Sequence, residues 1–160
     1  MKSKYVLLAS VLLISVATFA QKDQIKAAEK AFKGGKSQEA VTILAEAESL
    51  IANASDAEKA QFFFVKGNAL LDLANKKVST DTNLSLAAKA YQDLIDVEKA
   101  SGKGKYSAQA AASVTDIKFK LINAAKKKKK IDKHSESAKK LYDAYLLDKK
   151  DTINLYYAAS

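Results

Sequence analysis

The residues that could do acid–base or nucleophilic chemistry are few. The chain of 160 residues has one histidine and no cysteine. His134 stands beside Lys130 and Lys133, which would not hold a defined imidazole tautomer as a carboxylate does. Gly34-Gly35 and Gly102-x-Gly104 lack the spacing of a phosphate-binding loop. We therefore expect a non-catalytic protein that has no metal or other cofactor, because His and Cys are the usual transition-metal ligands.

The densest charge cluster is a run of lysines. It consists of Lys126, Lys127, Lys128, Lys129, Lys130 and Lys133. One interpretation is contact with anionic lipid or acidic polymer, since a lysine near an anionic membrane contributes about 1 kcal/mol. The other is a solvated helix end, whose cations suit the negative end of the helix dipole. Nucleic acid is not an expected partner, because base recognition favours arginine and the chain contains none.

Residues 1–20 have the three parts of a secretory signal peptide. Lysines precede an uncharged apolar stretch, and the segment Ala17-Thr18-Phe19-Ala20 puts small residues at the minus-three and minus-one positions before Gln21, as a cleavage site requires. The pattern predicts cleavage between Ala20 and Gln21 and an exported protein, in the periplasm or associated with the cell envelope. The alternative is an uncleaved anchor, although the stretch is shorter than the roughly 20 apolar residues that span a bilayer.

The composition of the remaining chain is typical of an all-α protein. Proline is absent, and alanine, lysine, leucine and glutamate, which favour helices, are abundant. Alternating β-branched runs between turn clusters do not occur. Because there is no cysteine, helix packing rather than disulfide bonds must stabilise the fold. The length of residues 21–160 predicts a single domain.

Apolar residues recur every three to four positions, which predicts a series of amphipathic helices. The expected helices are 22–33, 38–53, 56–75, 83–100, 106–131, 136–148 and one that begins at Asp151. Ser37 is the expected N-cap of the second helix, and Ser55 with Glu58 forms a capping box before the third. Polar segments 75–82 and 132–135 are expected to be a loop and a turn.

The last predicted helix is short for an independent helix and ends without a capping residue. It carries Tyr156 and Tyr157 as large apolar groups. We expect the sequence to be the N-terminal portion of a longer repeat protein; the alternative is a natural terminus that docks on the preceding helix pair.

A small–large–small pattern recurs in every second predicted helix. It occurs as Ala40-x3-Leu44-x2-Ala47, Ala87-x3-Tyr91-x2-Leu94 and Ala138-x3-Tyr142-x2-Tyr145. With these residues the chain resembles the tetratricopeptide repeat (TPR) family, which implies stacked antiparallel helix pairs in an α-solenoid. Its repeat spacing exceeds the family's roughly 34 residues, and the family's proline is absent. A generic helical bundle is the alternative.

Further positions support the resemblance. Phe63, Gly67 and Leu70 match first-helix positions of the family, with Gly67 letting the two helices of a unit approach closely. In the first unit the matching residues are small but lack the aromatic side chain. After the third unit the same register reaches Tyr156 and Ala159, as a fourth unit would.

The resemblance also implies a peptide-binding groove lined by the first helices of the units. In the second unit the groove positions are Gln61, Phe64, Asn68, Leu71 and Asp72. We therefore expect an exported scaffold that binds a protein or peptide partner, with Phe64 and Leu71 packed on a neighbouring unit as the alternative. The lysine cluster 126–133 as an anionic-surface module, and a helical part of a larger enzyme, are the alternative functions.

Overall fold

The computed structural model describes residues 21–129, 134–149 and 158. Residues 21–33 form a helix, followed by α2 (Ser37–Ala47), a 3-10 turn η1 (Ile51–Asn53), α3 (Asp56–Asn75), α4 (Thr80–Ser101), α5 (Ser107–Lys129) and α6 (His134–Leu147). No strand occurs among these residues, which confirms the all-α prediction. Within the same ranges, no helix combines the length and apolar character needed to cross a membrane.

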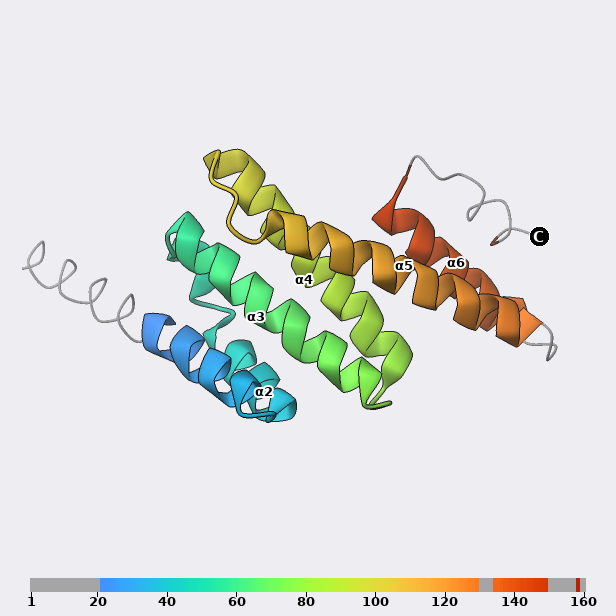
Figure 1. The fold of residues 1–160 in the computed structure, drawn as a ribbon, viewed down its shortest axis with the longest axis horizontal. Coiled ribbons are helices and arrows are strands. Elements are labelled where there is room, and N and C mark those ends of the chain that lie inside the picture. The colour runs from blue at the N-terminus through green and yellow to red at the C-terminus, as the bar shows by residue number, and fades with distance from the viewer. Residues whose placement is uncertain (1–20, 130–133, 150–157, 159–160) are drawn as a thin grey trace, which may run out of the picture.

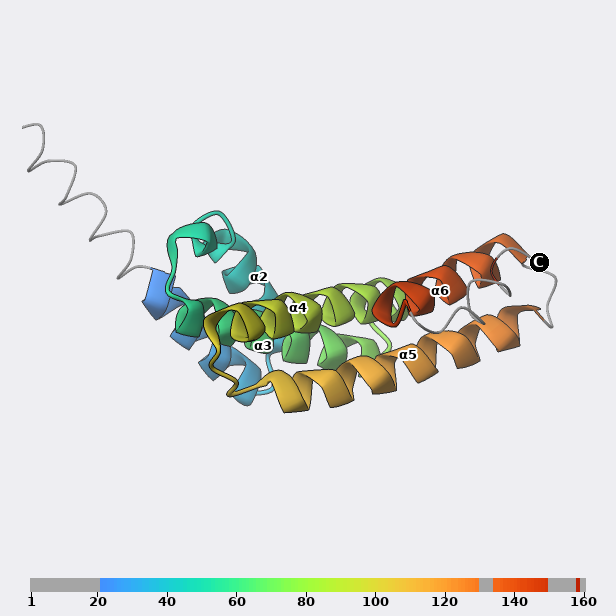
Figure 2. The same cartoon turned by 90° about the horizontal axis from the view of Figure 1, so that it is seen from above.

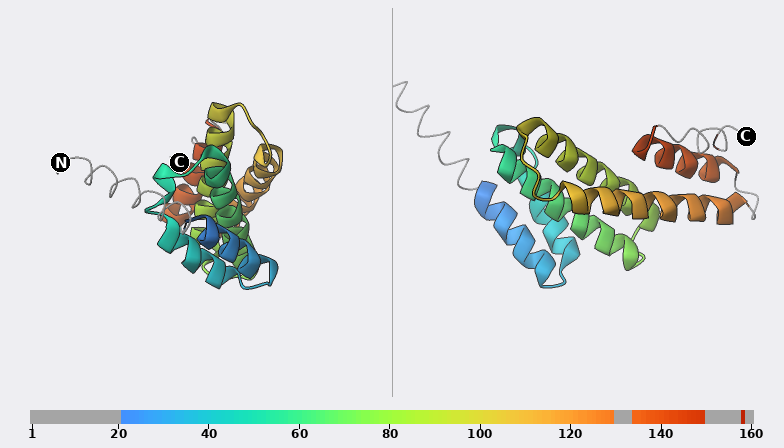
Figure 3. Two further views of the ribbon diagram at one scale, coloured as in Figure 1. Left: turned by 90° about the vertical axis from the view of Figure 1, so that its left-hand side faces the viewer. Right: turned by 45° about the horizontal axis from the view of Figure 1, so that its top comes forward.

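Consecutive helices alternate between two layers. The helix over residues 21–33, α3 and α5 lie on one side, whereas α2, α4 and α6 lie on the other (Figure 2). α3 packs along α4, α5 packs on α4 and α6, and α2 packs on α3 (Figure 1). The long helix α5 continues past the α3–α4 pair, and α6 packs on its second half (Figure 3). The arrangement is repeat-like because each helix packs mainly on the helices next to it in the sequence.

The central helix α3 is buried on more than one face, as expected of a helix whose apolar residues are not confined to one stripe. Phe62, Val65 and Ala69 pack in a cluster with the helix over residues 21–33 and α2. Leu70 and Ala74 belong to a second cluster, shared with α4, α5 and α6. α3 therefore connects the two parts of the core.

Gly67 brings α3 and α4 into close contact. A Cβ atom built on Gly67 would lie 2.6 Å from Cε1 of Tyr91. The Tyr91 side chain is fully buried, and its hydroxyl donates a hydrogen bond to Oδ1 of Asn68 at 2.7 Å. Burial raises the pKa of Tyr91 to about 12. The prediction that Gly67 permits a close approach of two helices is confirmed.

The small–large–small pattern is buried as expected in two of its three occurrences. Each of its residues in α2 and α4 is 0% exposed. In α6 the predicted register is wrong by one residue: Ser137, Leu141 and Ala144 are buried, whereas Tyr142 is 47% exposed. The small Ser137 side chain fits against α5, where its hydroxyl donates to the carbonyl oxygen of Ala125. The bulky phenol of Tyr142, with its polar tip, stays at the surface.

In the N-terminal part of the chain, the residues that begin and end the helices are partly as predicted. Gly35 has a φ of +77°, and the N–H of Lys36 donates to the Ala31 carbonyl at 3.0 Å, which together form a Schellman end. The capping box of Ser55 and Glu58 is present. The prediction of Ser37 as an N-cap is wrong, because Lys36 occupies that position.

Several predicted boundaries also shift. The second helix ends at Ala47 instead of residue 53, and α4 begins at Thr80 instead of residue 83. His134 and Ser135, which were expected to lie in a turn over 132–135, belong to α6. Residues 132 and 133 lie outside the described residues. Residues 1–20, 151–157, 159 and 160, with the signal peptide, Tyr156 and Ala159, lie outside the described residues.

Candidate functional site

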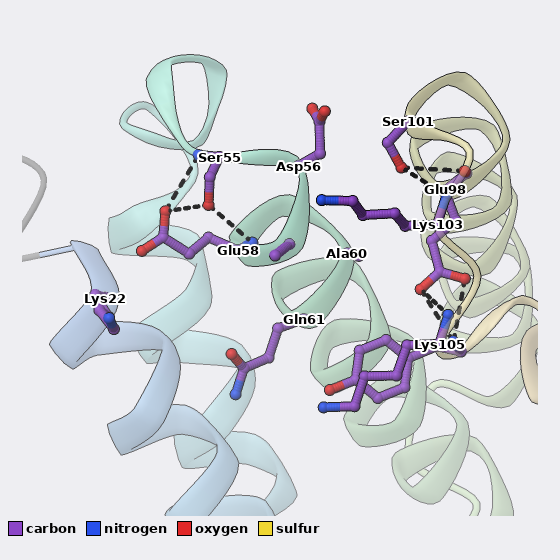
Figure 4. A pocket seen from close by; sticks show the side chains of 12 residues that line it. Lys22, Ser55, Asp56, Glu58, Ala60, Gln61, Glu98, Ser101, Lys103 and Lys105 are labelled. Carbon is purple, nitrogen blue, oxygen red and sulfur yellow. Dashed lines mark hydrogen bonds between the residues drawn. The ribbon is translucent and has the colours of Figure 1, made fainter.

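A cleft of about 720 Å³ lies at one end of the helical layers. The start of the helix over residues 21–33 contributes Lys22, the start of α3 contributes Asp56 and Gln61, and the segment after α4 contributes Lys103 and Lys105 (Figure 4). Its volume falls within the range of roughly 300–1,000 Å³ that is common for ligand pockets. Three segments far apart in sequence thus form one concave surface.

Glu98 fixes the conformation of the segment after α4, which forms one wall of this cleft. Its side chain belongs to the last turn of α4 and the residue is only 4% exposed. Its carboxylate accepts hydrogen bonds from the backbone N–H groups of Lys105 at 2.9 Å, Tyr106 at 3.0 Å and Ser107 at 2.8 Å, and from the Ser107 hydroxyl. The negative charge therefore satisfies the donors at the beginning of α5, as an N-terminal cap does.

The electrostatics of Glu98 follow from these contacts. Burial alone raises the pKa of a carboxyl group, but the hydrogen bonds from Ser107 and from the backbone N–H groups outweigh it. The pKa of Glu98 is consequently below its ordinary value of 4.5. Glu98 stays ionised down to acidic pH and keeps its hold on the loop.

The main chain holds the same loop at its beginning. Gly102 ends α4 with a φ of +67°, a conformation that glycine adopts without steric cost. The N–H of Lys103 then donates to the main-chain carbonyl of Glu98 at 3.2 Å. Glu98 therefore fixes the segment 102–107 with both its backbone and its side chain.

The α3 wall is fixed by the capping box. The N–H of Ser55 donates to the Glu58 carboxylate at 3.1 Å, and the Ser55 hydroxyl also donates to it at 2.6 Å. The hydrogen bond from the Ser55 side chain lowers the pKa of Glu58. Both walls of the cleft are thus ordered by contacts within the protein.

Aromatic and cationic groups meet where α3 contacts the segment before α5. The ring of Phe64 stacks on that of Tyr106, with centroids 4.3 Å apart and planes 16° from parallel. The Lys105 Nζ lies 4.8 Å from the centre of the Tyr106 ring. A hydrogen bond with the Tyr106 side chain raises the pKa of Lys105. Lys22, Lys103 and Asp56 are exposed around this apolar surface.

The residues predicted to line a groove make contacts with neighbouring helices. Gln61 donates to Glu29 of the first helix at 2.7 Å, Phe64 stacks on Tyr106, and Asn68 accepts the Tyr91 hydroxyl. Leu71 packs against the cluster shared by α3 to α6. Asp72 accepts from Ser37 and pairs with Lys76 at 2.7 Å. Of the five, Gln61 also lines the cleft.

The lysine cluster lies at the far end of α5. Lys126 is exposed, and the helix continues to Lys129. The side chains of Lys127, Lys128 and Lys129, and the whole of Lys130 and Lys133, lie outside the described residues. The same holds for the side chain of His134.

The sequence interpretation missed Glu98, Lys103, Lys105 and Tyr106 as site residues. One indication was available: an acidic residue in the last turn of a helix opposes the helix dipole. Glu98 is such a residue, and its position is explained only by the start of α5. The loop lysines carried no comparable pattern.

Comparison of the chain with protein-family models, curated proteins and solved structures finds no match. In the described ranges there is also no group of three or more His, Cys, Asp or Glu residues placed to hold a metal ion. The site is therefore interpreted from its own geometry.

Proposed function

We propose that the protein is an exported, non-catalytic helical scaffold of TPR-like type that binds a protein or peptide partner in the cleft. The cleft carries the proposal, because it combines an apolar surface with charged groups from three segments. The exposed Ala57 and the partly exposed Tyr106 ring offer contact to an apolar side chain of the partner. Lys22, Lys103 and Asp56 surround it and can pair with polar groups of a bound peptide.

Preorganisation supports this proposal. The capping box of Ser55 and Glu58 orders one wall, and the hydrogen bonds of Glu98 order the other. A ligand that binds between rigid walls does not have to order them, so less binding free energy is lost. The site lies beside the predicted groove, because Gln61 lines the cleft and Phe64 stacks on Tyr106.

Site-specific photo-crosslinking tests the cleft. A photoreactive amino acid placed at Lys103 should capture a partner in intact cells of the native host. The same group at Glu46, which is exposed on α2 and does not line the cleft, should not capture it. Equal capture from both positions would contradict a specific role for the cleft.

The captured partner then allows a quantitative test. Lys103→Glu reverses an exposed charge in the cleft and should raise the Kd at least about tenfold, which corresponds to about 1.4 kcal/mol. Lys30→Glu makes the same change on an exposed site of the first helix, outside the cleft, and should leave the Kd within about twofold. The alternative, binding of an anionic surface by residues 126–133, predicts the reverse: changing Lys126–Lys130 to glutamine abolishes binding while Lys103→Glu retains it.

A further inference from the structure

In the first turn of the helix over residues 21–33, one side-chain amide nitrogen and one side-chain amide oxygen are buried without a hydrogen-bond partner. Gln21 is 3% exposed, and its Nε2 is buried with no partner among the described residues. The Oε1 of Gln24 is buried and unpaired in the same way. Gln21 lies on the same helix face as the core residues Ile25 and Ala28. An unmatched buried donor and an unmatched buried acceptor one turn apart require an explanation, since such groups are rare in folded proteins.

We propose that the mature chain begins with Gln21 as pyroglutamate, and that the lactam N–H donates to Oε1 of Gln24. The inference rests on the export proposed above, because cleavage after Ala20 frees the α-amine of Gln21. That amine attacks Cδ of its own side chain. The new N–Cδ bond closes a five-membered lactam, the Cδ–Nε2 bond breaks, and Nε2 leaves as ammonia with the proton from the amine.

Ring closure removes the atom that has no partner. The Oε1 oxygen of Gln21 stays as the lactam carbonyl, whereas the buried Nε2 is lost. The reaction also replaces a cationic α-ammonium by a neutral amide at a helix N-terminus, where the helix dipole disfavours positive charge. Because both reacting atoms belong to one residue, burial of the side chain does not require a second molecule to enter.

The spacing of the two glutamines supports the new hydrogen bond. In a capping box, Glu or Gln three residues after the first residue accepts a hydrogen bond from that residue's backbone N–H. Gln24 stands at this position relative to Gln21. Cleavage makes Gln21 the first residue of the chain, and Gln24 Oε1 is a buried acceptor that lacks a donor one turn away. Cyclisation thus removes the unpaired donor, and the lactam N–H supplies the hydrogen bond that Gln24 Oε1 lacks.

The test begins with the full chain, expressed with residues 1–20 in an exporting bacterium. We expect the purified protein to have the mass of residues 21–160 less one ammonia. Edman sequencing should be blocked, and after unfolding and pyroglutamate aminopeptidase treatment it should read from Lys22. A free Gln21 amine would overturn the inference and leave export intact. An uncleaved chain in the membrane would overturn both.

A separate test addresses the hydrogen bond between the lactam N–H and Gln24 Oε1. Its presence and its absence predict opposite changes in the melting temperature. If Gln24 accepts from the lactam, Gln24→Leu in the cyclised protein lowers the melting temperature. If Oε1 stays unpaired, the same change removes a buried unsatisfied acceptor and raises the melting temperature, which would refute the bond. Gln38→Leu, at an exposed site near the start of α2, is the control and should have little effect on melting.

Discussion

Enlarging Gly67 should destabilise the fold, although it lies in the middle of a helix where glycine is itself unfavourable. Built on the backbone, its Cβ would lie 2.6, 2.8 and 2.9 Å from three atoms of the Tyr91 ring. Ordinary contact begins at about 3.4 Å, so either the ring or α3 must move by most of an ångström. Tyr91 cannot yield easily, because its ring is fully buried and its hydroxyl is bonded to Asn68.

Two contributions of opposite sign determine how much a larger residue at position 67 changes the free energy of unfolding. Overpacking a well-packed core costs about 1–3 kcal/mol, whereas replacing glycine in a helix gains up to about 1 kcal/mol. We expect Gly67→Ala to lower the free energy of unfolding by about 0–2 kcal/mol and Gly67→Leu by about 1–3 kcal/mol. For a domain of this size, each kcal/mol lowers the melting temperature by roughly 2–4 °C.

Thermal unfolding followed by circular dichroism measures these effects, and two controls isolate their cause. Ala112→Gly, at an exposed site of α5, gives the helix-propensity contribution in this protein. In a double-mutant cycle of Gly67→Ala with Tyr91→Leu, the smaller side chain should relieve the overlap, with a coupling of about 0.5–3 kcal/mol. If Gly67→Ala raises the melting temperature by the full propensity gain, the close contact with Tyr91 is refuted.

Two further predictions concern the walls of the cleft. Glu98→Gln should destabilise the protein by about 1.5–3 kcal/mol. Hydrogen exchange at the amides of Lys105, Tyr106 and Ser107 should accelerate, and unchanged exchange would contradict the hydrogen bonds that they donate to Glu98. Because the folded pKa of Glu98 is lowered, its stabilisation is present above pH 4.5 and is lost as the pH falls through the folded pKa, so the acid-induced loss of stability should be smaller in Glu98→Gln. Ser55→Ala should cost about 1 kcal/mol in urea unfolding, and a cost near zero would refute the cap.

Local signals in the sequence predicted much of the fold. Two of these signals depend only on residues that are neighbours in the sequence, so the sequence alone predicts them. They are the capping box of Ser55 and Glu58 and the helix end at Gly35. The errors arose where tertiary contacts decide. Ser37 has the right type for an N-cap, but its hydroxyl donates to Asp72 of α3 instead. In α6, helical periodicity fits the register of Tyr142 as well as that of Leu141, and only packing against α5 distinguishes them.

The candidate site was less predictable because it is assembled from separate segments. Gln61 lies on α3 and Tyr106 on the segment before α5, and no sequence spacing predicts that they share a cleft. The groove predicted from the family resemblance assumes side chains that face an open surface. Here Asn68 and Asp72 are engaged with Tyr91 and Ser37, contacts that depend on the actual crossing of the helices.

Glu98 shows why local preference and tertiary structure can disagree at a site. Its carboxylate lies at the C-terminal end of α4, where the dipole of that helix opposes a negative charge, and at the N-terminal end of α5, where the dipole favours it. Three N–H donors at close range outweigh the unfavourable end. The same carboxylate thus determines how α4 joins α5 and where the cleft lysines stand.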